Sequence, residues 1–224
     1  MSQIPHGPLD FHIQNDIDRG IVRKELGFCP RDRVILMFGA IRPYKGIDTA
    51  LMAFSKIVKK VPEARLVIVG KLWEDWGSYD RLIRYLKIED YVKTFLKYIP
   101  AEKVGHFFSA SDLVILPYHH FDSQSGVGAT ALAFRKPMIV TKTGGLPELV
   151  SDQFYIVPPG DSKALAEKII CCLKDPSRLL SMSEETDKIA NKISWQTIAL
   201  KTLSIYRRVI LEKRSTGKKQ SWGM

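Results

Sequence analysis

Short continuous apolar runs alternate along the chain with longer stretches in which apolar residues recur every three or four positions. Continuous runs are typical of strands buried on both faces of a parallel sheet, and the periodic stretches predict amphipathic helices. The predicted strands are residues 33–39, 65–70, 92–98, 112–116, 138–141 and 154–157. The predicted helices are residues 16–26, 47–60, 78–86, 100–110, 162–173, 176–191 and 194–211, together with one that begins near Ser125.

This alternation predicts βαβ units with right-handed crossovers. The expected fold class is α/β, a doubly wound Rossmann-like parallel sheet of about six strands with helices on both faces. We assign residues 16–193 to this domain. Two prolines and a glycine make residues 1–15 look like the remnant of an interdomain linker. We expect a closing helix over residues 194–213 and a disordered basic tail over residues 214–224.

Composition is that of an ordinary globular protein, with 224 residues, 45% of them apolar and 26% charged. The three cysteines show neither a disulfide framework nor metal-ligand spacing, so we expect no metal, and a reducing, cytoplasmic location. We find no signal peptide and no apolar run of about 18 residues or more.

The formal net charge of +10 favours an anionic partner. The basic residues are spread over the predicted helices, with a denser group between residues 207 and 219. This distribution indicates solvated helix faces and a frayed tail, which is compatible with peripheral membrane contact of a full-length protein. No aromatic-stacking or helix-turn-helix pattern supports a nucleic-acid partner.

The most informative stretch is residues 117–148, which follows a buried strand and contains Ser125, Gly126, Gly128 and Ala129 at the start of a helix. The start of a helix after a parallel strand lies at the carboxyl edge of the sheet, where open α/β folds bind ligands. Its unpaired N–H groups and its dipole favour an anion such as phosphate. Taken alone, the same small residues fit a helix that merely packs closely on a sheet.

Two cations, Arg42 and Lys45, follow the first strand near the start of the next helix. Facing the Gly126 helix across a crevice, they would form a clamp suited to a diphosphate. Pro43 and Gly46 are turn residues, so a solvated turn explains the same segment without a ligand.

Six motifs occur in order along most of the chain. They are Gly39-Ala-Ile-Arg-Pro-Tyr-Lys-Gly46, Val67-Ile-Val-Gly70, Ala110-Ser-Asp-Leu-Val-Ile-Leu-Pro117, Gln124-Ser-Gly126, Arg135-Lys-Pro-Met-Ile-Val-Thr141 and Gly144-Gly-Leu-Pro-Glu148. Together they resemble the C-terminal domain of retaining, family-4 glycosyltransferases of the GT-B fold. The segment Ile4-Pro-His-Gly7 is similar to the linker that enters that domain.

The resemblance implies a glycosyltransferase of the hexosyltransferase type that uses a UDP- or GDP-linked sugar as substrate and needs no cofactor. The acceptor would be held by an N-terminal domain absent from this chain, without which the domain would be inactive. Lys45 would contact the diphosphate, with the backbone of Ser125 and Gly126 holding sugar and phosphate. Tyr98 and Ile99, before Pro100, would line the base. Cations and N–H dipoles would stabilise the nucleoside diphosphate leaving group.

Two positions depart from the family pattern. The family places an arginine where this chain has Ala40, and we expect Arg42 to substitute for it. The family's pair of glutamates maps to Asp122, our candidate catalytic residue on the donor-sugar side, and to Thr130. Loss of the second carboxylate should cost about 1 to 3 kcal/mol in ribose binding unless Gln124 or Ser123 replaces it.

His119 and His120 should point to opposite sides of an extended segment, which predicts hydrogen-bonded loop histidines and no joint metal site. Glu148 fits either a contact to the donor sugar or a carboxylate at a helix start.

Two functions fit these features, a donor-binding half of an enzyme and a stand-alone nucleotide-sugar-binding regulatory module without catalytic activity. A Rossmann oxidoreductase is disfavoured because no G-x-G-x-x-G follows the first strand.

Overall fold

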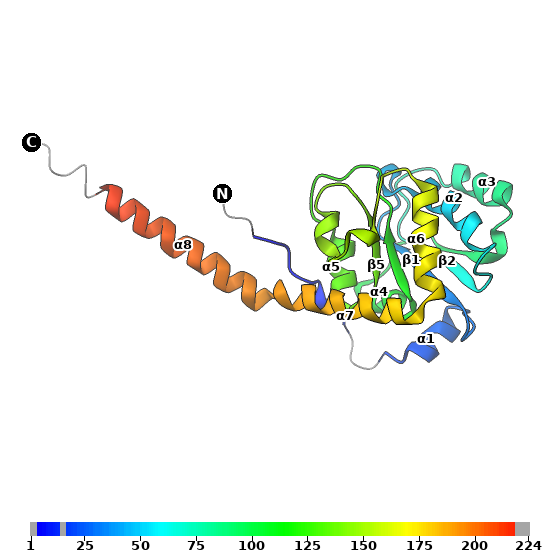
Figure 1. Ribbon diagram of the computed structural model, residues 1–224, viewed down its shortest axis with the longest axis horizontal. Helices are drawn as coiled ribbons and strands as arrows, with labels where there is room; N and C mark the ends of the chain where they lie inside the picture. The colour runs from blue at the N-terminus through cyan, green and yellow to red at the C-terminus, as the bar shows by residue number, and fades with distance from the viewer. Residues whose placement is uncertain (1–3, 14–16, 218–224) are drawn as a thin grey trace, which may run out of the picture.

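The computed structural model describes residues 4–13 and 17–217. Its sheet has six parallel strands in the order β3-β2-β1-β4-β5-β6, which confirms the predicted α/β class (Figure 1). The strands are β1 Arg33–Phe38, β2 Ala64–Val69, β3 Val92–Phe95, β4 Leu113–Leu116, β5 Met138–Thr141 and β6 Ile156–Val157. The third strand ends three residues earlier than predicted, and Phe154 and Tyr155 belong to a 3-10 turn instead of the last strand.

Eight α-helices precede, connect or follow the strands in the described part of the chain. They are α1 Arg19–Glu25, α2 Ile47–Ile57, α3 Gly77–Leu86, α4 Ala101–Ala110, α5 Gly126–Ala133, α6 Ser162–Lys174, α7 Pro176–Lys192 and α8 Trp195–Gly217. The described residues also form short 3-10 turns at η1 Asp10–His12, before α1, and at η2 Pro43–Lys45, η3 Glu89–Tyr91, η4 Leu146–Leu149 and η5 Gln153–Tyr155. The predicted first helix is shorter than expected because Asp18 caps it, accepting a hydrogen bond from the Ile21 amide.

Successive residues of each central strand enter two different cores, as a sheet covered on both faces requires. Ile35 and Met37 pack with α2, α3 and α6, whereas Val34 and Leu36 pack with α4 and α5. The helices predicted for both faces are therefore present.

The N-terminal segment and the start of α8 lie side by side on one side of the domain (Figure 1). The Trp195 indole donates a hydrogen bond to the Pro8 carbonyl at 2.8 Å, and the Leu9 amide donates one to the Ala129 carbonyl at 3.1 Å. The predicted linker thus packs on α5 and on the start of α8.

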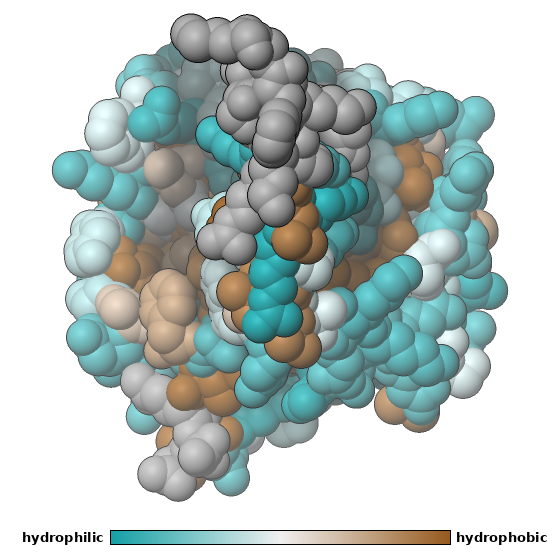
Figure 2. Space-filling view, turned by 90° about the vertical axis from the view of Figure 1, so that its left-hand side faces the viewer, coloured by the Kyte–Doolittle hydropathy of each residue, from teal (hydrophilic) through white to brown (hydrophobic). Residues whose placement is uncertain are grey.

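Beyond its first turns, α8 leaves the body of the domain, and its apolar side chains remain open to solvent (Figures 1 and 2). The exposed apolar residues of this part are Leu200, Leu203, Tyr206, Val209, Ile210 and Leu211. The helix continues to Gly217, so residues 214–217 of the predicted disordered tail are helical, and residues 218–224 lie outside the described residues. No helix in the described ranges has both the length and the apolar character needed to cross a membrane.

Candidate functional site

The sheet order places β1 between β2 and β4, so the chain reverses its direction of winding at β1 and β4. Such a switch point leaves a crevice outside the carboxyl ends of the two strands. The loops that leave β1 and β4 are tied together there, because the His119 amide donates to the Tyr44 carbonyl at 2.8 Å. Gly46, at φ 67°, lies so close to the Pro117 carbonyl that a Cβ would come within 2.0 Å of the oxygen.

Lys45 is the buried cation of this crevice, with 7% of the residue exposed. Its Nζ donates to the Tyr118 hydroxyl at 2.8 Å and to the Phe38 carbonyl at 3.3 Å. No carboxylate of the described residues lies within ion-pair distance of this ammonium. Burial, and secondarily the charge of Arg42, lower the pKa of Lys45 from 10.5 to about 7.

The first turn of α5 lies directly beside Lys45. The Ser125 hydroxyl caps the helix by accepting from the Gly128 amide at 3.2 Å, and it lies 3.4 Å from the Tyr118 hydroxyl. Tyr118 therefore bridges the lysine and the start of the helix. The amides of Gly126 and Val127 make no hydrogen bond with any described residue and remain available to a ligand.

Gly39 allows this close approach of the two loops. Its φ is 98°, and a Cβ there would lie 2.9 Å from Val127 Cγ2 and 3.1 Å from Lys45 Nζ. Any larger residue would push the lysine and the helix start apart.

Arg42 is exposed and lies over the indole of Trp73, with its guanidinium carbon 4.5 Å from the ring centroid. Its charge is one of the two causes of the lowered pKa of Lys45. The structure thus brings together Arg42, Lys45, Ser125 and Gly126, four residues that we expected to bind a diphosphate.

The residues expected at the nucleoside are more dispersed. Thr130 is buried, and its hydroxyl donates to the Gly126 carbonyl at 2.9 Å. The Gln124 side chain accepts from the His6 amide at 2.5 Å and lies 3.5 Å from a Glu148 carboxylate oxygen. Tyr98 is 71% exposed in the loop before α4, whereas Ile99 packs against the core.

Asp122 is exposed in the loop between β4 and α5, together with Ser123. Of the two histidines, His119 lies 3.0 Å from the Thr49 hydroxyl and 3.2 Å from an Asp48 carboxylate oxygen, whereas His120 is exposed. The described residues contain no group of three or more potential metal ligands. His119 is thus a hydrogen-bonded loop histidine, as the pattern predicted, whereas His120 packs near the Tyr44 ring.

A pocket of about 320 Å³ adjoins the start of α5 on the side of the linker and α7. Gln124, Ser125 and Glu148 line it together with His6 and Lys192. The N-terminal segment therefore forms one wall of the hollow beside the candidate anion site.

Sequence reasoning did not identify two residues of this site, Tyr118 and Trp73. Tyr118 is the first aromatic residue after β4, and Trp73 follows β2 within the run Gly70-Lys-Leu-Trp73. An aromatic residue directly after a parallel strand is the signal that could have indicated them, because such residues lie at the ligand edge of the sheet.

Comparison with known proteins shows the family. The model of the family described as Glycosyl transferases group 1 matches residues 18–189. A D-inositol 3-phosphate glycosyltransferase of Segniliparus rotundus is 30% identical over 212 residues, which are 92% of this chain and 46% of that protein. The chain spans about half the length of the curated relatives it matches.

Two solved structures show the same fold. The C-terminal domain of a group 1 family glycosyl transferase from Francisella tularensis is 20% identical, has a TM-score of 0.71, and is covered over 97% of its length by 84% of this chain. An Anabaena protein, HepE, solved in complex with UDP and glucose, is 22% identical with a TM-score of 0.77, over 92% of this chain and 55% of that one. The chain therefore belongs to the group 1 glycosyl transferases, and its sheet is that of the C-terminal half of a GT-B fold.

Proposed function

We propose that this chain is the donor-binding half of a retaining glycosyltransferase of the hexosyltransferase type. A nucleoside diphosphate sugar binds with its diphosphate between Arg42 and Lys45 on one side and the first turn of α5 on the other. The single observation that carries the proposal is the buried Lys45 ammonium, which has no carboxylate partner in the described structure and lies next to two unpaired helix amides.

The free-energy cost of burying the Lys45 charge without a counter-ion indicates that an anionic ligand binds here. A buried charge without a counter-ion destabilises a folded protein by several kcal/mol, so buried charges are normally paired. Lys45 has two neutral oxygen acceptors, Tyr118 and Phe38, and a neighbouring cation, Arg42, that makes its environment less favourable. A diphosphate would supply the missing negative charge and would also accept hydrogen bonds from the Gly126 and Val127 amides.

The same groups suit the chemistry of glycosyl transfer. When the bond from the sugar to the diphosphate breaks, negative charge grows on the leaving phosphate oxygen. Fixed cations and N–H dipoles aimed at that oxygen stabilise the transition state more than the ground state. We assign Asp122 to the sugar side, because it lies in the exposed loop immediately before the capped start of α5.

The nucleoside is assigned to the side of Tyr98 and Ile99. Because the Thr130 hydroxyl already donates to its own helix, it offers a ribose only its acceptor lone pairs. Gln124 keeps an amide N–H near Glu148 and is the better donor for a ribose or sugar hydroxyl.

The acceptor, the retained configuration and turnover belong to the whole protein. We propose retention because the six motifs are those of the retaining family, and we place the acceptor on an N-terminal domain, since the chain spans about half of its relatives. The isolated half should bind the donor without turning it over, and no cofactor is required. All three thiols are unpaired, as in the reducing cytoplasm that we propose for the protein. Peripheral membrane contact through the basic end of α8 stays a prediction.

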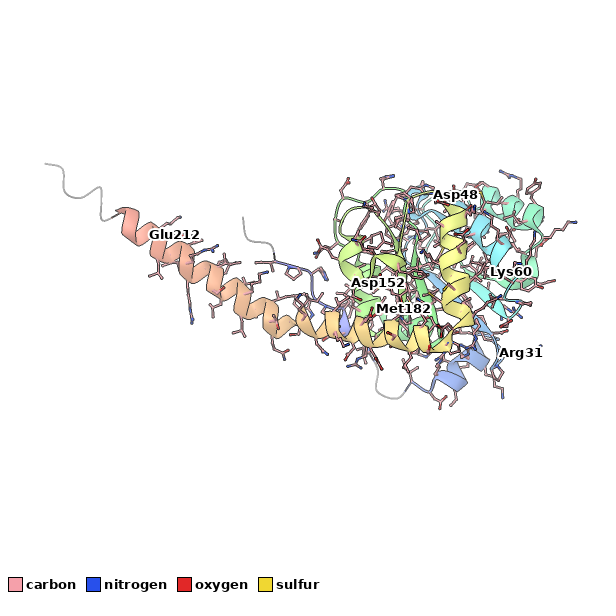
Figure 3. The ribbon with its side chains drawn as sticks, in the orientation of Figure 1. Arg31, Asp48, Lys60, Asp152, Met182 and Glu212 are labelled. Atoms are coloured by element: carbon pink, nitrogen blue, oxygen red, sulfur yellow. The ribbon has the colours of Figure 1, made fainter. Side chains whose placement is uncertain are left out.

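Titration calorimetry of the chain with UDP, GDP and ADP tests donor binding. We expect one of the three to bind and Lys45→Ala to abolish that binding. Lys60→Ala is the matched control, because Lys60 is exposed and follows the end of α2 remote from Asp48 and the crevice (Figure 3). If the wild type binds none of the three, or if Lys45→Ala binds as the wild type does, the proposal is wrong.

A further inference from the structure

The loop that follows β2 is joined to the loop that follows β1. Ile41 forms a parallel bridge with Leu72, its amide donates to the Lys71 carbonyl at 2.9 Å, and its carbonyl accepts from the Trp73 amide at 3.1 Å. These contacts fix the backbone on both sides of the Arg42–Trp73 pair. The pair therefore lies at the carboxyl edge of the sheet beside the crevice.

Trp73 has no packing role that explains it. The side chain is 61% exposed and belongs to neither hydrophobic core, although its neighbours Leu72 and Trp76 pack against the core of α2 and α3. Its ring instead carries the Arg42 guanidinium at 4.5 Å, with the Lys71 ammonium more distant at 5.8 Å. A cation over an indole face is attracted by the ring quadrupole, and arginine also stacks on it.

Within the described residues, Trp73 is the contact that can hold the Arg42 guanidinium in place. Among the described residues no carboxylate pairs with its guanidinium, and it makes no side-chain hydrogen bond to them. A long exposed arginine without a partner samples many rotamers, and a ligand must then order it on binding. Contact with the indole reduces that freedom before the ligand arrives.

The second cation of the clamp depends on this placement. Arg42 precedes the turn that ends at Lys45, and the Lys45 amide donates to the Arg42 carbonyl at 3.0 Å, so the two side chains leave the same turn. The charge of Arg42 also contributes to the lowered pKa of Lys45. Bringing two cations together is unfavourable without an anion, so a group that holds Arg42 in position must oppose their repulsion.

We propose that Trp73 is a positioning residue that holds the Arg42 guanidinium beside Lys45, so that the two basic side chains are already placed together as one diphosphate clamp. The inference rests on the proposed function. It adds to it the reason why Arg42 can bind the diphosphate although the family's arginine position is occupied by Ala40 in this chain. Trp73 acts through Arg42 and does not contact the nucleoside.

A double-mutant cycle tests this role. Affinities for whichever of UDP, GDP and ADP binds the wild type are measured for the wild type, Trp73→Ala, Arg42→Ala and the double variant. Loss of an exposed cation–π contact converts to roughly two- to fivefold weaker binding for Trp73→Ala. Arg42→Ala should weaken binding about tenfold or more, because a charge-assisted contact is lost. In the Arg42→Ala background, Trp73→Ala should have no further effect.

Two variants separate positioning from folding. Trp73→Phe keeps an aromatic face and should retain affinity within about twofold of the wild type. Tyr85→Ala is the matched control for removal of an exposed aromatic residue, since Tyr85 on α3 is 82% exposed. Thermal melting of each variant shows whether a loss of affinity reflects unfolding.

Three results would overturn the inference. The first is a Trp73→Ala variant that binds the nucleotide as tightly as the wild type. The second is a Trp73→Ala change that weakens binding equally in the presence and in the absence of Arg42. The third is a Trp73→Phe variant that binds as weakly as Trp73→Ala. Equal weakening without Arg42 would mean that Trp73 contacts the ligand directly. If the wild type binds none of the nucleotides, the proposed function fails and this inference fails with it. If the wild type binds and Lys45→Ala does not, but the cycle shows no coupling, only the role of Trp73 is wrong.

Discussion

Replacing Lys45 by methionine should stabilise the ligand-free domain at low pH. Methionine keeps an unbranched side chain at this buried position but removes the charge. In the folded wild type the pKa of Lys45 is about 7, whereas an unfolded lysine titrates near 10.5. Between these two values the unfolded chain binds more protons than the folded one, so the free energy of unfolding rises with pH across that window. Below pH 7 both states are protonated and the folded state carries the full cost of the buried charge.

The size of the effect follows from the same two values. At about 1.4 kcal/mol per pKa unit, the drop from 10.5 to about 7 corresponds to roughly 5 kcal/mol. Methionine also removes the two hydrogen bonds to Phe38 and Tyr118, which together contribute about 1 to 3 kcal/mol. The desolvation cost is the larger of the two. We therefore expect the variant to be more stable than the wild type by roughly 2 to 4 kcal/mol at pH 6.

At pH 10 and above the order should reverse, because the neutral lysine then keeps its hydrogen bonds without the charge. Urea unfolding at pH 6, 8 and 10 measures the difference between the two proteins. Burial also lowers the pKa of Lys136, to about 8. Because Lys136 is present in both proteins, its contribution cancels when their free energies of unfolding are subtracted. Lys60→Met, at an exposed position, is the control and should show no pH-dependent difference. A stability difference that stays constant from pH 6 to pH 10 would refute the assignment of Lys45 as a buried, unpaired cation.

Three further predictions concern the same crevice. Binding of a nucleoside diphosphate should raise the pKa of Lys45 from about 7, so the lysine should take up a proton when the ligand binds. Calorimetry in buffers of different ionisation enthalpy should show uptake of roughly one proton at pH 8 and close to none at pH 6. Equal proton uptake at the two pH values would contradict this prediction. Gly39→Ala should lower the melting temperature more than Gly160→Ala does. Both glycines have positive φ, but only Gly39 has neighbours that a Cβ would strike. Equal melting temperatures of the two variants would contradict the crowding around Gly39. Ser125→Ala removes the cap of α5 and should cost about 1 kcal/mol in urea unfolding, together with weaker nucleotide binding; unchanged stability would show that the cap contributes nothing.

The sheet was predictable because its strands are buried on both faces. A run such as residues 34–38 has no polar position to tolerate solvent on either side, so strand type and parallel topology follow from the pattern. The ends of elements depend on local groups that periodicity does not show, such as the cap at Asp18. Residues 214–217 were wrongly predicted to be disordered, because α8 continues through them.

The candidate site was predictable only in part. Parallel strands bring their carboxyl ends to one edge, so residues after β1 and β4 had to lie near each other. The contact of Lys45 with Tyr118 joins residues 73 positions apart and depends on how two loops cross, about which hydrophobic periodicity contains no information. The engagement of Gln124 by the His6 amide likewise depends on the path of the N-terminal segment. Both contacts affect ligand binding. The contact with Tyr118 holds the Lys45 ammonium in a buried position, and the His6 amide occupies the side-chain oxygen of Gln124, a candidate partner of the ribose.

Burial of Lys45 links the stability of the domain to its proposed activity. If Lys45 were exposed, the ligand-free protein would be more stable than it is with the lysine buried. Water would then screen the attraction between the lysine and a diphosphate. In the observed position the ammonium has already lost most of its water and is oriented by Tyr118, so binding requires little reorganisation of the site. The energy that destabilises the empty domain at neutral pH is therefore recovered when the anion binds. For this reason the substitution that most stabilises the ligand-free fold, Lys45→Met, should also be the one that abolishes nucleotide binding.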